Sequence, residues 1–176
     1  VTNFIRRRFI MRWVALSRVK HLNKALSNKR NYFHAKNRLV APICIGELRM
    51  AVMTFPLLFA RGKNSFELFA LLGLEQDRNL MVQPDGNWLT SFIPASVRTY
   101  PFALGNLNDG KRQVLIAEDD NVFVNRDKGD PLFNEDGSEG KVIEYYVKLL
   151  NGVTESRLKI EMACQLLDDF DLFKPF

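Results

Sequence analysis

Three consecutive acidic residues, Glu118, Asp119 and Asp120, follow the apolar segment at positions 114–117. Carboxylates at the end of a strand can bind a cation or act as general acid and base. With Arg98 as a cationic partner, they are candidate ligand-binding residues and the groups that an enzyme would use. The competing interpretation is a solvated turn, because the acids that follow lack the fixed spacing of a calcium-binding loop.

Aromatic residues near Arg98 are the second group of candidates. Trp88 follows the turn at residues 84–86, and Tyr100 precedes a proline. Exposed aromatic side chains make binding anchors, whereas buried ones form ordinary core. We favour the core for these aromatic residues and keep Trp88, Arg98 and Tyr100 as ligand-binding candidates.

Histidine and cysteine, which are common metal ligands and catalytic residues, each occur only twice in the sequence. His21 and His34 lie in a basic stretch without ligating neighbours, so we expect neither a metal site nor His-based catalysis. Cys44 and Cys164 sit in apolar runs with no base nearby, which favours burial as small hydrophobic residues. Nucleotide-binding glycine motifs and the nucleophile-elbow motif are absent. We therefore expect no catalytic residue, no metal and no cofactor.

One short phrase occurs twice and predicts the frame of the fold. Thr54-Phe55-Pro56-Leu57 aligns with Thr99-Tyr100-Pro101-Phe102, 45 residues later. An apolar helical stripe precedes each proline, and the proline must end the helix because it lacks an amide donor. The stripes are Leu48, Ala51, Val52 and Phe55 in the first copy, and Ile93, Val97 and Tyr100 in the second. Strand, turn and strand follow each proline, so we predict two helix–Pro–strand–strand repeats.

The last third of the chain is predicted to be helical. Asn151-Gly152 is typical of a helix C-cap, so we expect a helical hairpin that packs on the sheet. The first helix would carry Val142/Ile143, Tyr146 and Leu149/Leu150 on its apolar face, and the second Ile160, Ala163/Cys164, Leu167 and Phe170. A docked apolar tail with Leu172, Phe173 and Phe176 would end the chain.

Charge is divided unevenly along the chain. Residues 1–38 hold 11 Lys/Arg and no acid, whereas residues 39–176 hold 14 Lys/Arg and 20 Asp/Glu, which is a net charge of +11 against −6. The basic arm can lie along the acidic body of its own chain or of a second copy, and the division of charge suggests a homo-oligomer held partly by charge. No aromatic RNA-binding signature or zinc-finger spacing supports nucleic acid. Weak contact with a membrane surface through the basic arm is a further alternative.

Length and composition bound the architecture. A chain of 176 residues with 47% hydrophobic residues fits one domain with a sizeable core. We expect a basic N-terminal arm over residues 1–38, with an arm or loop at 17–37, and a single α+β domain with a mainly antiparallel sheet over residues 39–176. Neither a secretory cleavage site nor a run of about 18 apolar residues is visible. The expected location is the cytoplasm, with envelope association as the alternative.

Three segments carry a family resemblance. They are GELRMAVMTFPLLF at 46–59, IPASVRTYPF at 93–102 and GDPLFNEDG at 129–137. Together they resemble the bacterial SapC family over roughly residues 11–176. The resemblance implies a component linked to a bacterial surface layer, or an accessory protein encoded near outer-membrane uptake receptors and flavin-dependent tryptophan halogenases. It brings no established catalytic residues to this sequence.

These observations favour a non-catalytic binding or assembly accessory protein with a protein partner. The reasons are the absence of catalytic constellations, the division of charge and the family resemblance. The alternative is an enzyme or enzyme partner acting on a peptide or amino-acid-derived substrate. It would use Glu118, Asp119 or Asp120 with Arg98, and it requires these side chains to share a concave pocket.

Overall fold

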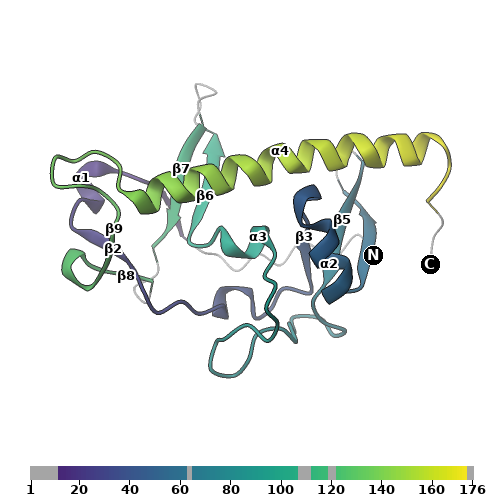
Figure 1. Ribbon diagram of the computed structural model, residues 1–176, viewed down its shortest axis with the longest axis horizontal. Helices are drawn as coiled ribbons and strands as arrows, with labels where there is room; N and C mark the ends of the chain where they lie inside the picture. Colours follow the sequence, from purple (N-terminus) through teal and green to yellow (C-terminus); the bar gives the residue numbers. More distant parts are fainter. Residues whose placement is uncertain (1–11, 63–64, 107–111, 119–121, 174–176) are drawn as a thin grey trace. The chain divides into compact units, whose positions relative to one another are not determined.

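The computed structural model of the protein describes residues 12–62, 65–106, 112–118 and 122–173 (Figure 1). These residues form two compact units, each with its own hydrophobic core. Unit 1 takes its described residues from segments 31–98 and 152–173, and unit 2 takes them from segments 12–30 and 99–151. Helix α4 (Lys141–Asp169) contributes residues to both units.

Unit 1 is built on a three-stranded antiparallel sheet with the order β3-β5-β4. Its elements are η1 (Phe33–Ala35), β3 (Val40–Pro42), η2 (Ile45–Glu47), α2 (Leu48–Thr54), β4 (Leu57–Arg61), β5 (Phe66–Leu71), α3 (Ala95–Arg98) and the second part of α4. Pro42 lies in the edge strand β3, because a central strand would need its missing amide. The core includes Phe55, Leu68, Ala70, Trp88, Ile160 and Cys164.

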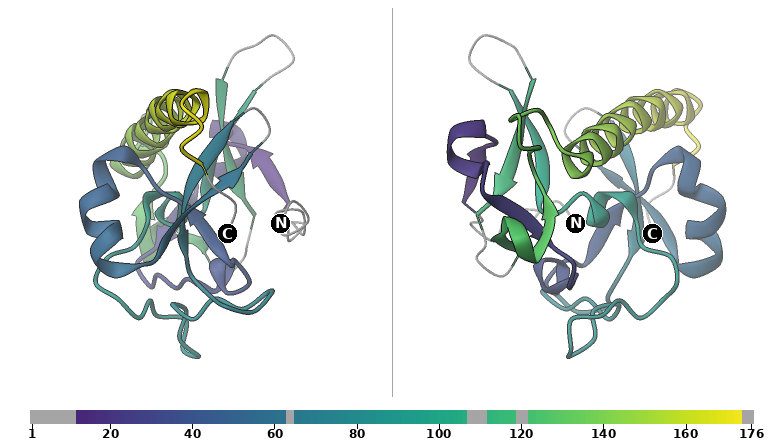
Figure 2. Two further views of the ribbon diagram at one scale, coloured as in Figure 1. Left: turned by 90° about the vertical axis from the view of Figure 1, so that its right-hand side faces the viewer. Right: turned by 60° about the vertical axis from the view of Figure 1, so that its left-hand side comes forward.

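Unit 2 contains two further antiparallel sheets, with the orders β1-β7-β6 and β8-β2-β9. Figure 2 shows the strands from two further directions. The elements are β1 (Trp13–Ala15), α1 (Arg18–His21), β2 (Lys24–Ser27), β6 (Phe102–Asn106), β7 (Arg112–Ala117), β8 (Phe123–Asn125), η3 (Arg126–Lys128), β9 (Gly129–Pro131) and the start of α4. Its core includes Leu26, Phe102, Ile116, Phe123, Leu132, Ile143, Tyr146 and Leu150.

The two predicted helix–Pro–strand–strand repeats are confirmed. Helix α2, Pro56 and the hairpin β4–β5 form the first copy, and α3, Pro101 and the hairpin β6–β7 form the second. The copies differ in which aromatic residue is buried. Phe55 before the proline is buried in the first copy, and Phe102 after the proline is buried in the second. Tyr100 is half-buried, and the Tyr100–Pro101 peptide bond is cis.

The predicted apolar stripe of α2 is partly wrong. Ala51 and Phe55 are buried, but Leu48 and Val52 are 41% and 62% exposed. Helix α2 has only seven residues, and the pair at i and i+4 is enough to anchor so short a helix. The apolar residues beside that pair are therefore left on the surface.

The predicted C-terminal helical hairpin is wrong, because α4 continues through Asn151 and Gly152 as one helix. A Cβ at Gly152 would meet open space, and glycine inside a helix costs about 1 kcal/mol relative to alanine. Apolar burial on both sides of this dipeptide outweighs that cost. The buried residues are Ile143, Tyr146, Leu150, Ile160 and Cys164.

The end of the chain is docked in part. The Phe173 ring packs against Phe59 and Phe66, with centroid distances of 5.0 and 4.0 Å. Phe170 was predicted on the buried face of the helix but is largely exposed, and Leu172 is exposed as well. Phe176 lies outside the described residues.

The basic stretch at 17–37, predicted as an arm or loop, contains α1, β2 and η1. Strand β2 is central in its sheet, and its residues Ala25 and Leu26 are buried. Two apolar residues in a polar run carry no periodic signal, so this strand depends on its partners β8 and β9. The α+β class is confirmed, with three small sheets among the described residues in place of one main sheet. The boundary between arm and domain at residue 38 stays a prediction.

Candidate binding surface and pocket

Trp88 lies in the core of unit 1. Its indole nitrogen donates hydrogen bonds to Thr90 Oγ1 at 3.1 Å and to the Phe92 carbonyl oxygen at 3.0 Å. The Tyr32 ring meets it edge-on, with the centroids 5.6 Å apart. The polar atom of Trp88 is therefore satisfied internally, as buried tryptophans require. A ligand-binding role for Trp88 stays a prediction.

Arg98 pairs with Glu47, which was not among the predicted site residues. Arg98 Nη2 lies 3.0 Å from Glu47 Oε1, and Arg98 Nε donates to the Ile93 carbonyl oxygen at 3.0 Å. The same Glu47 oxygen accepts from the Ala95 amide at 2.8 Å, and its second oxygen accepts from the Cys44 amide at 3.3 Å. The Glu47 side chain is 12% exposed. Arg98 thus belongs to a network that joins η2 to the first residue of α3.

The remaining predicted site residues belong to the other part of the chain. Tyr100 and Glu118 lie in unit 2, whereas Trp88 and Arg98 lie in unit 1. The Tyr100 carbonyl oxygen accepts a hydrogen bond from the Tyr146 hydroxyl at 3.5 Å. Residues 119 and 120, the two aspartates of the acidic run, lie outside the described residues.

Glu118 is exposed and lies beside the buried His21. His21 Nδ1 accepts a hydrogen bond from the Ser17 amide at 2.9 Å, so the proton of the neutral ring is on Nε2. That nitrogen lies 3.9 Å from Glu118 Oε1. Burial lowers the pKa of His21, and the Glu118 carboxylate opposes this shift. The pair is a buried neutral imidazole beside a solvated carboxylate.

Both cysteines are free and lie in unit 1. Burial, together with the nearby Glu47 carboxylate, raises the pKa of Cys44 to about 11. Burial also raises the pKa of Cys164. Since the thiolate is the nucleophile, these shifts disfavour cysteine reactivity at neutral pH.

His34, the histidine of unit 1, has a strongly lowered pKa. Its Nε2 donates to the Val97 carbonyl oxygen at 3.2 Å. Burial, assisted by the positive charge of Arg38, lowers the pKa of His34 to about 4, although the bond to Val97 acts in the opposite direction. The folded chain therefore holds this ring neutral over a range in which an unfolded histidine is protonated.

The pKa of His34 predicts a loss of stability in mild acid. Between the folded pKa of about 4 and the unfolded value of 6.5, the unfolded state binds more protons, so stability is complete above pH 6.5 and falls as the pH drops toward 4. The loss between pH 7.5 and pH 4.5 should be about 2 kcal/mol. Urea titrations at both pH values should show a smaller loss for His34→Gln. An unchanged loss in that variant would contradict this role of His34.

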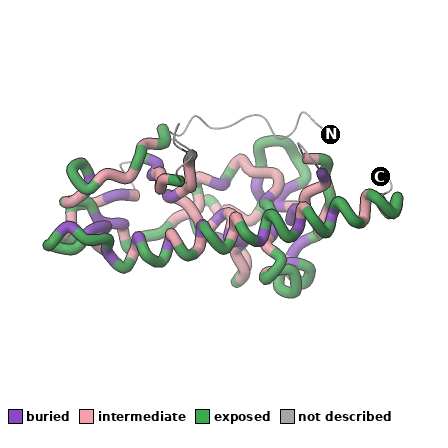
Figure 3. The backbone as a smooth tube through the Cα atoms, turned by 90° about the horizontal axis from the view of Figure 1, so that it is seen from above, coloured by how far each residue is buried: buried purple, intermediate pink, exposed green. Residues whose placement is uncertain are grey.

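The most distinctive surface feature of unit 1 is a row of apolar side chains along the last part of α4 and on Phe170, the residue that follows the helix; we call it the α4 stripe. It consists of Leu158, Met162, Leu166 and Phe170, which are 54%, 70%, 60% and 73% exposed. Residues four apart share one face of a helix. In Figure 3 the exposed residues of α4 are the green parts of its tube, which alternate with intermediate and buried ones. A contiguous exposed apolar face of this kind marks an interaction site.

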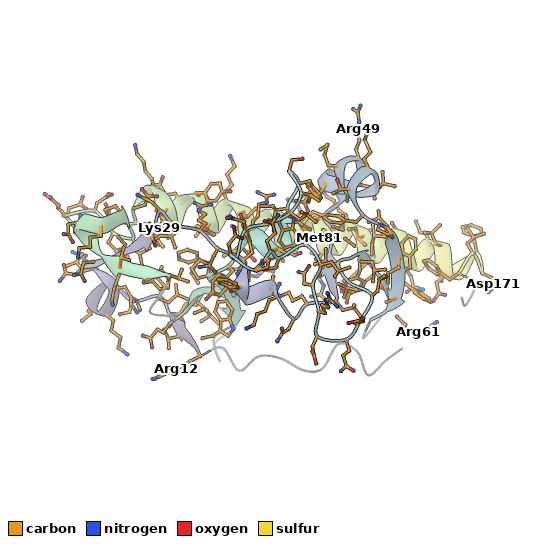
Figure 4. The ribbon with its side chains drawn as sticks, turned by 90° about the horizontal axis from the view of Figure 1, so that it is seen from below. Arg12, Lys29, Arg49, Arg61, Met81 and Asp171 are labelled. Carbon is orange, nitrogen blue, oxygen red and sulfur yellow. The ribbon has the colours of Figure 1, made fainter. Side chains whose placement is uncertain are left out.

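Helix α2 presents a second exposed apolar group in unit 1. Met50, Val52 and Met53 are 50%, 62% and 78% exposed. Arg49 stands among them and points away from the helix (Figure 4). Because this group has a cation within it and spans fewer turns, the α4 stripe is the stronger candidate for a binding surface.

Unit 2 contains a pocket of about 430 Å³ beside β9 and the start of α4. Three cations line it, Arg30, Arg126 and Lys141, together with the single acid Asp130 and the ring of Tyr145. No ion pair is present for any of the three cations among the described residues. The pocket is therefore positively charged. It contains none of the site residues that the sequence predicted.

Some of these features had a signal in the sequence and others had none. The stripe could have been found from its spacing of four, and Glu47 stands three residues after Cys44, as in a capping box. The pocket cations Arg30, Arg126 and Lys141 come from three separate segments. No local spacing relates residues so far apart.

Comparison with known proteins gives one match. A family model described as SapC matches residues 16–176 of the chain. No curated protein and no solved structure matches it. In the described part of the chain, none of the helices combines the length and hydropathy that crossing a membrane requires, and no group of three or more His, Cys, Asp or Glu side chains could hold a metal ion.

Proposed function

Because this chain belongs to the SapC family and exposes the α4 stripe, we propose that it is a non-catalytic binding or assembly protein that pairs with a second copy of itself. The α4 stripe is the observation that carries this proposal. The stripe has four large apolar side chains, each more than half exposed. Burying them in an interface removes apolar surface from water, which lowers the free energy of association.

The pattern of the stripe suits pairing between identical helices. Residues at i, i+4, i+8 and i+12 form one ridge on a helix surface. Two such ridges interdigitate when the helices cross at about −50°, which is the commonest class of helix packing. In an antiparallel two-fold pair, Met162 and Leu166 of both copies lie at the crossing point, because a two-fold interface uses the same patch twice.

The charges along α4 agree with this arrangement. Residues 162–167 are uncharged, and the centres of protein interfaces are depleted of charge. Arg157 and Lys159 precede this segment, but each pairs with a glutamate of the same helix, Glu161 at 3.2 Å and Glu155 at 2.7 Å. These pairs leave no net charge over residues 155–161, so the uncharged centre and the spacing of the stripe carry the arrangement.

Met162→Glu and Leu166→Glu are each expected to convert a dimer into a monomer. The two-fold axis places each new carboxylate near its own copy in the partner, within apolar surroundings, and like charges there are strongly unfavourable. Sedimentation velocity should show a wild-type dimer at both low and high salt. Each variant should associate at least about tenfold more weakly.

Leu89→Glu is the matched control, since Leu89 is 56% exposed in unit 1 and lies outside α4. This variant should keep the dimer. The proposal is contradicted if the wild type is a monomer, or if Met162→Glu and Leu166→Glu both remain dimers. A dimer that dissociates at high salt would favour the charge-held oligomer instead. Flotation of the wild type with lipid vesicles would assign the stripe to a membrane surface.

The family resemblance adds an envelope setting, at a surface layer or with an uptake receptor, and that setting is part of the proposal. The enzyme alternative, acting on a peptide or amino-acid-derived substrate, stays a prediction. Of the residues that this enzyme would use, Arg98 forms an ion pair with Glu47. Glu118 lies close to His21.

A further inference from the structure

We propose that the pocket of unit 2 binds a small organic dianion that carries a planar ring, such as an aryl phosphate. Its volume of about 430 Å³ falls within the range of about 300–1,000 Å³ that is typical of small-molecule sites. The site lies outside the α4 stripe and does not depend on self-association.

The charge of the pocket defines the sign and size of the ligand charge. Arg30, Arg126 and Lys141 contribute three positive charges and Asp130 one negative charge, which leaves a net charge of +2. None of the three cations has an ion-pair partner among the described residues. Lys141 also opens α4, where the helix dipole adds to the positive potential. A dianion would balance this excess.

Arg126 is already held in place for such a ligand. Its Nη1 donates to the carbonyl oxygens of Leu22 at 3.3 Å and Phe133 at 2.7 Å. These bonds orient the guanidinium group without neutralising it, and its remaining donors can meet a phosphate in a forked arrangement. Preorganisation of this kind reduces the entropy that binding would otherwise lose.

The two tyrosines of the pocket provide the contact for a ring. Tyr146 is buried and donates its hydroxyl proton to the Tyr100 carbonyl oxygen. Tyr145 is 48% exposed and meets Tyr146 edge-on, with the centroids 5.2 Å apart. Tyr145 therefore has a supported ring with an exposed face, on which the planar ring of a ligand can stack.

Isothermal titration of the full chain with phenyl phosphate tests the proposal. Saturable binding is expected that weakens as salt is added, because the cations are partly solvated. The double variant Arg30→Gln/Lys141→Gln should bind at least about tenfold more weakly, since it loses two charge-assisted contacts. Both side chains are exposed and have no bond in the described fold that the substitutions would break.

Lys29→Gln/Lys148→Gln is the control, because it removes the same charge from neighbouring exposed positions outside the pocket; Lys29 is labelled in Figure 4. It should bind phenyl phosphate like the wild type. Tyr145→Leu should reduce the affinity for phenyl phosphate to the affinity that the wild type has for inorganic phosphate. The proposal is overturned if Arg30→Gln/Lys141→Gln binds phenyl phosphate as tightly as the wild type does. It is also overturned if the wild type binds inorganic phosphate as tightly as phenyl phosphate, or binds phosphatidylglycerol vesicles more tightly than phenyl phosphate.

Discussion

Glu47→Ala is expected to lower the free energy of unfolding of unit 1 by about 3 kcal/mol. The substitution removes the acceptor that Arg98, the Ala95 amide and the Cys44 amide share. Since the Glu47 side chain is only 12% exposed, water can replace the carboxylate only in part. An unpaired donor in such a position costs more than the hydrogen bond itself contributed.

Fluorine NMR of the chain labelled with fluorotryptophan measures this effect during urea titration. The protein has two tryptophans, and Trp88 reports unit 1 whereas Trp13 reports unit 2. Glu75→Ala is the matched control, because Glu75 pairs with Arg78 at 3.2 Å but both side chains are largely solvated. Exposed ion pairs contribute about 0–1 kcal/mol to the free energy of unfolding. If both variants lose the same stability, Glu47 does not have the role assigned to it.

Phe102→Ala is expected to destabilise unit 2 by about 4 kcal/mol. The Phe102 side chain is 1% exposed, and its ring lies 4.2 Å from the Tyr146 centroid and 6.1 Å from that of Phe123. Removing the ring loses its transfer free energy and leaves a cavity. The neighbouring rings are held by a helix and a strand, so the cavity can close only in part.

Leu57→Ala is the control for this prediction, because Leu57 follows the proline of the first copy as Phe102 follows that of the second. Leu57 is only partly buried, and its truncation should cost about 1–2 kcal/mol in unit 1. The fluorotryptophan signal of Trp13 should move to lower urea in Phe102→Ala, and that of Trp88 in Leu57→Ala. A smaller effect for Phe102→Ala than for Leu57→Ala would contradict the burial argument.

The helix–Pro–hairpin repeats were predictable because proline acts locally. Pro56 and Pro101 end a helix whatever surrounds them, since the missing amide and the restricted preceding residue are properties of the chain itself. The strand, turn and strand that follow each proline then predicted the two hairpins. The copies could not be told apart in the same way, because the depth of Phe55 and Phe102 depends on what packs against each hairpin.

Two elements were mispredicted where tertiary packing outweighed a local signal. Asn151-Gly152 is typical of a helix end, but the buried side chains before and after it keep α4 continuous. Strand β2 lies in a basic run, and the pairing with β8 and β9 determines its conformation. Helix and strand propensities are weak compared with the burial of several apolar side chains.

The candidate pocket was beyond prediction for a geometric reason. Arg30, Arg126 and Lys141 share a cavity because β9 and the start of α4 come together after folding. No periodicity links them in the sequence. The acidic run at residues 118–120, which is obvious in the sequence, has its described member Glu118 on the surface beside His21.

The Glu47 carboxylate has a consequence for dividing the chain into fragments. Helix α3 has only four residues, and its first amide, that of Ala95, donates a hydrogen bond to a carboxylate 48 positions earlier. A peptide that contained only the second helix–Pro–strand–strand repeat would lack this acceptor. It should not form α3, because one isolated turn is unstable in water. Split-protein designs must therefore keep residues 47 and 95 in the same fragment, or accept that α3 forms only when the two fragments reassemble.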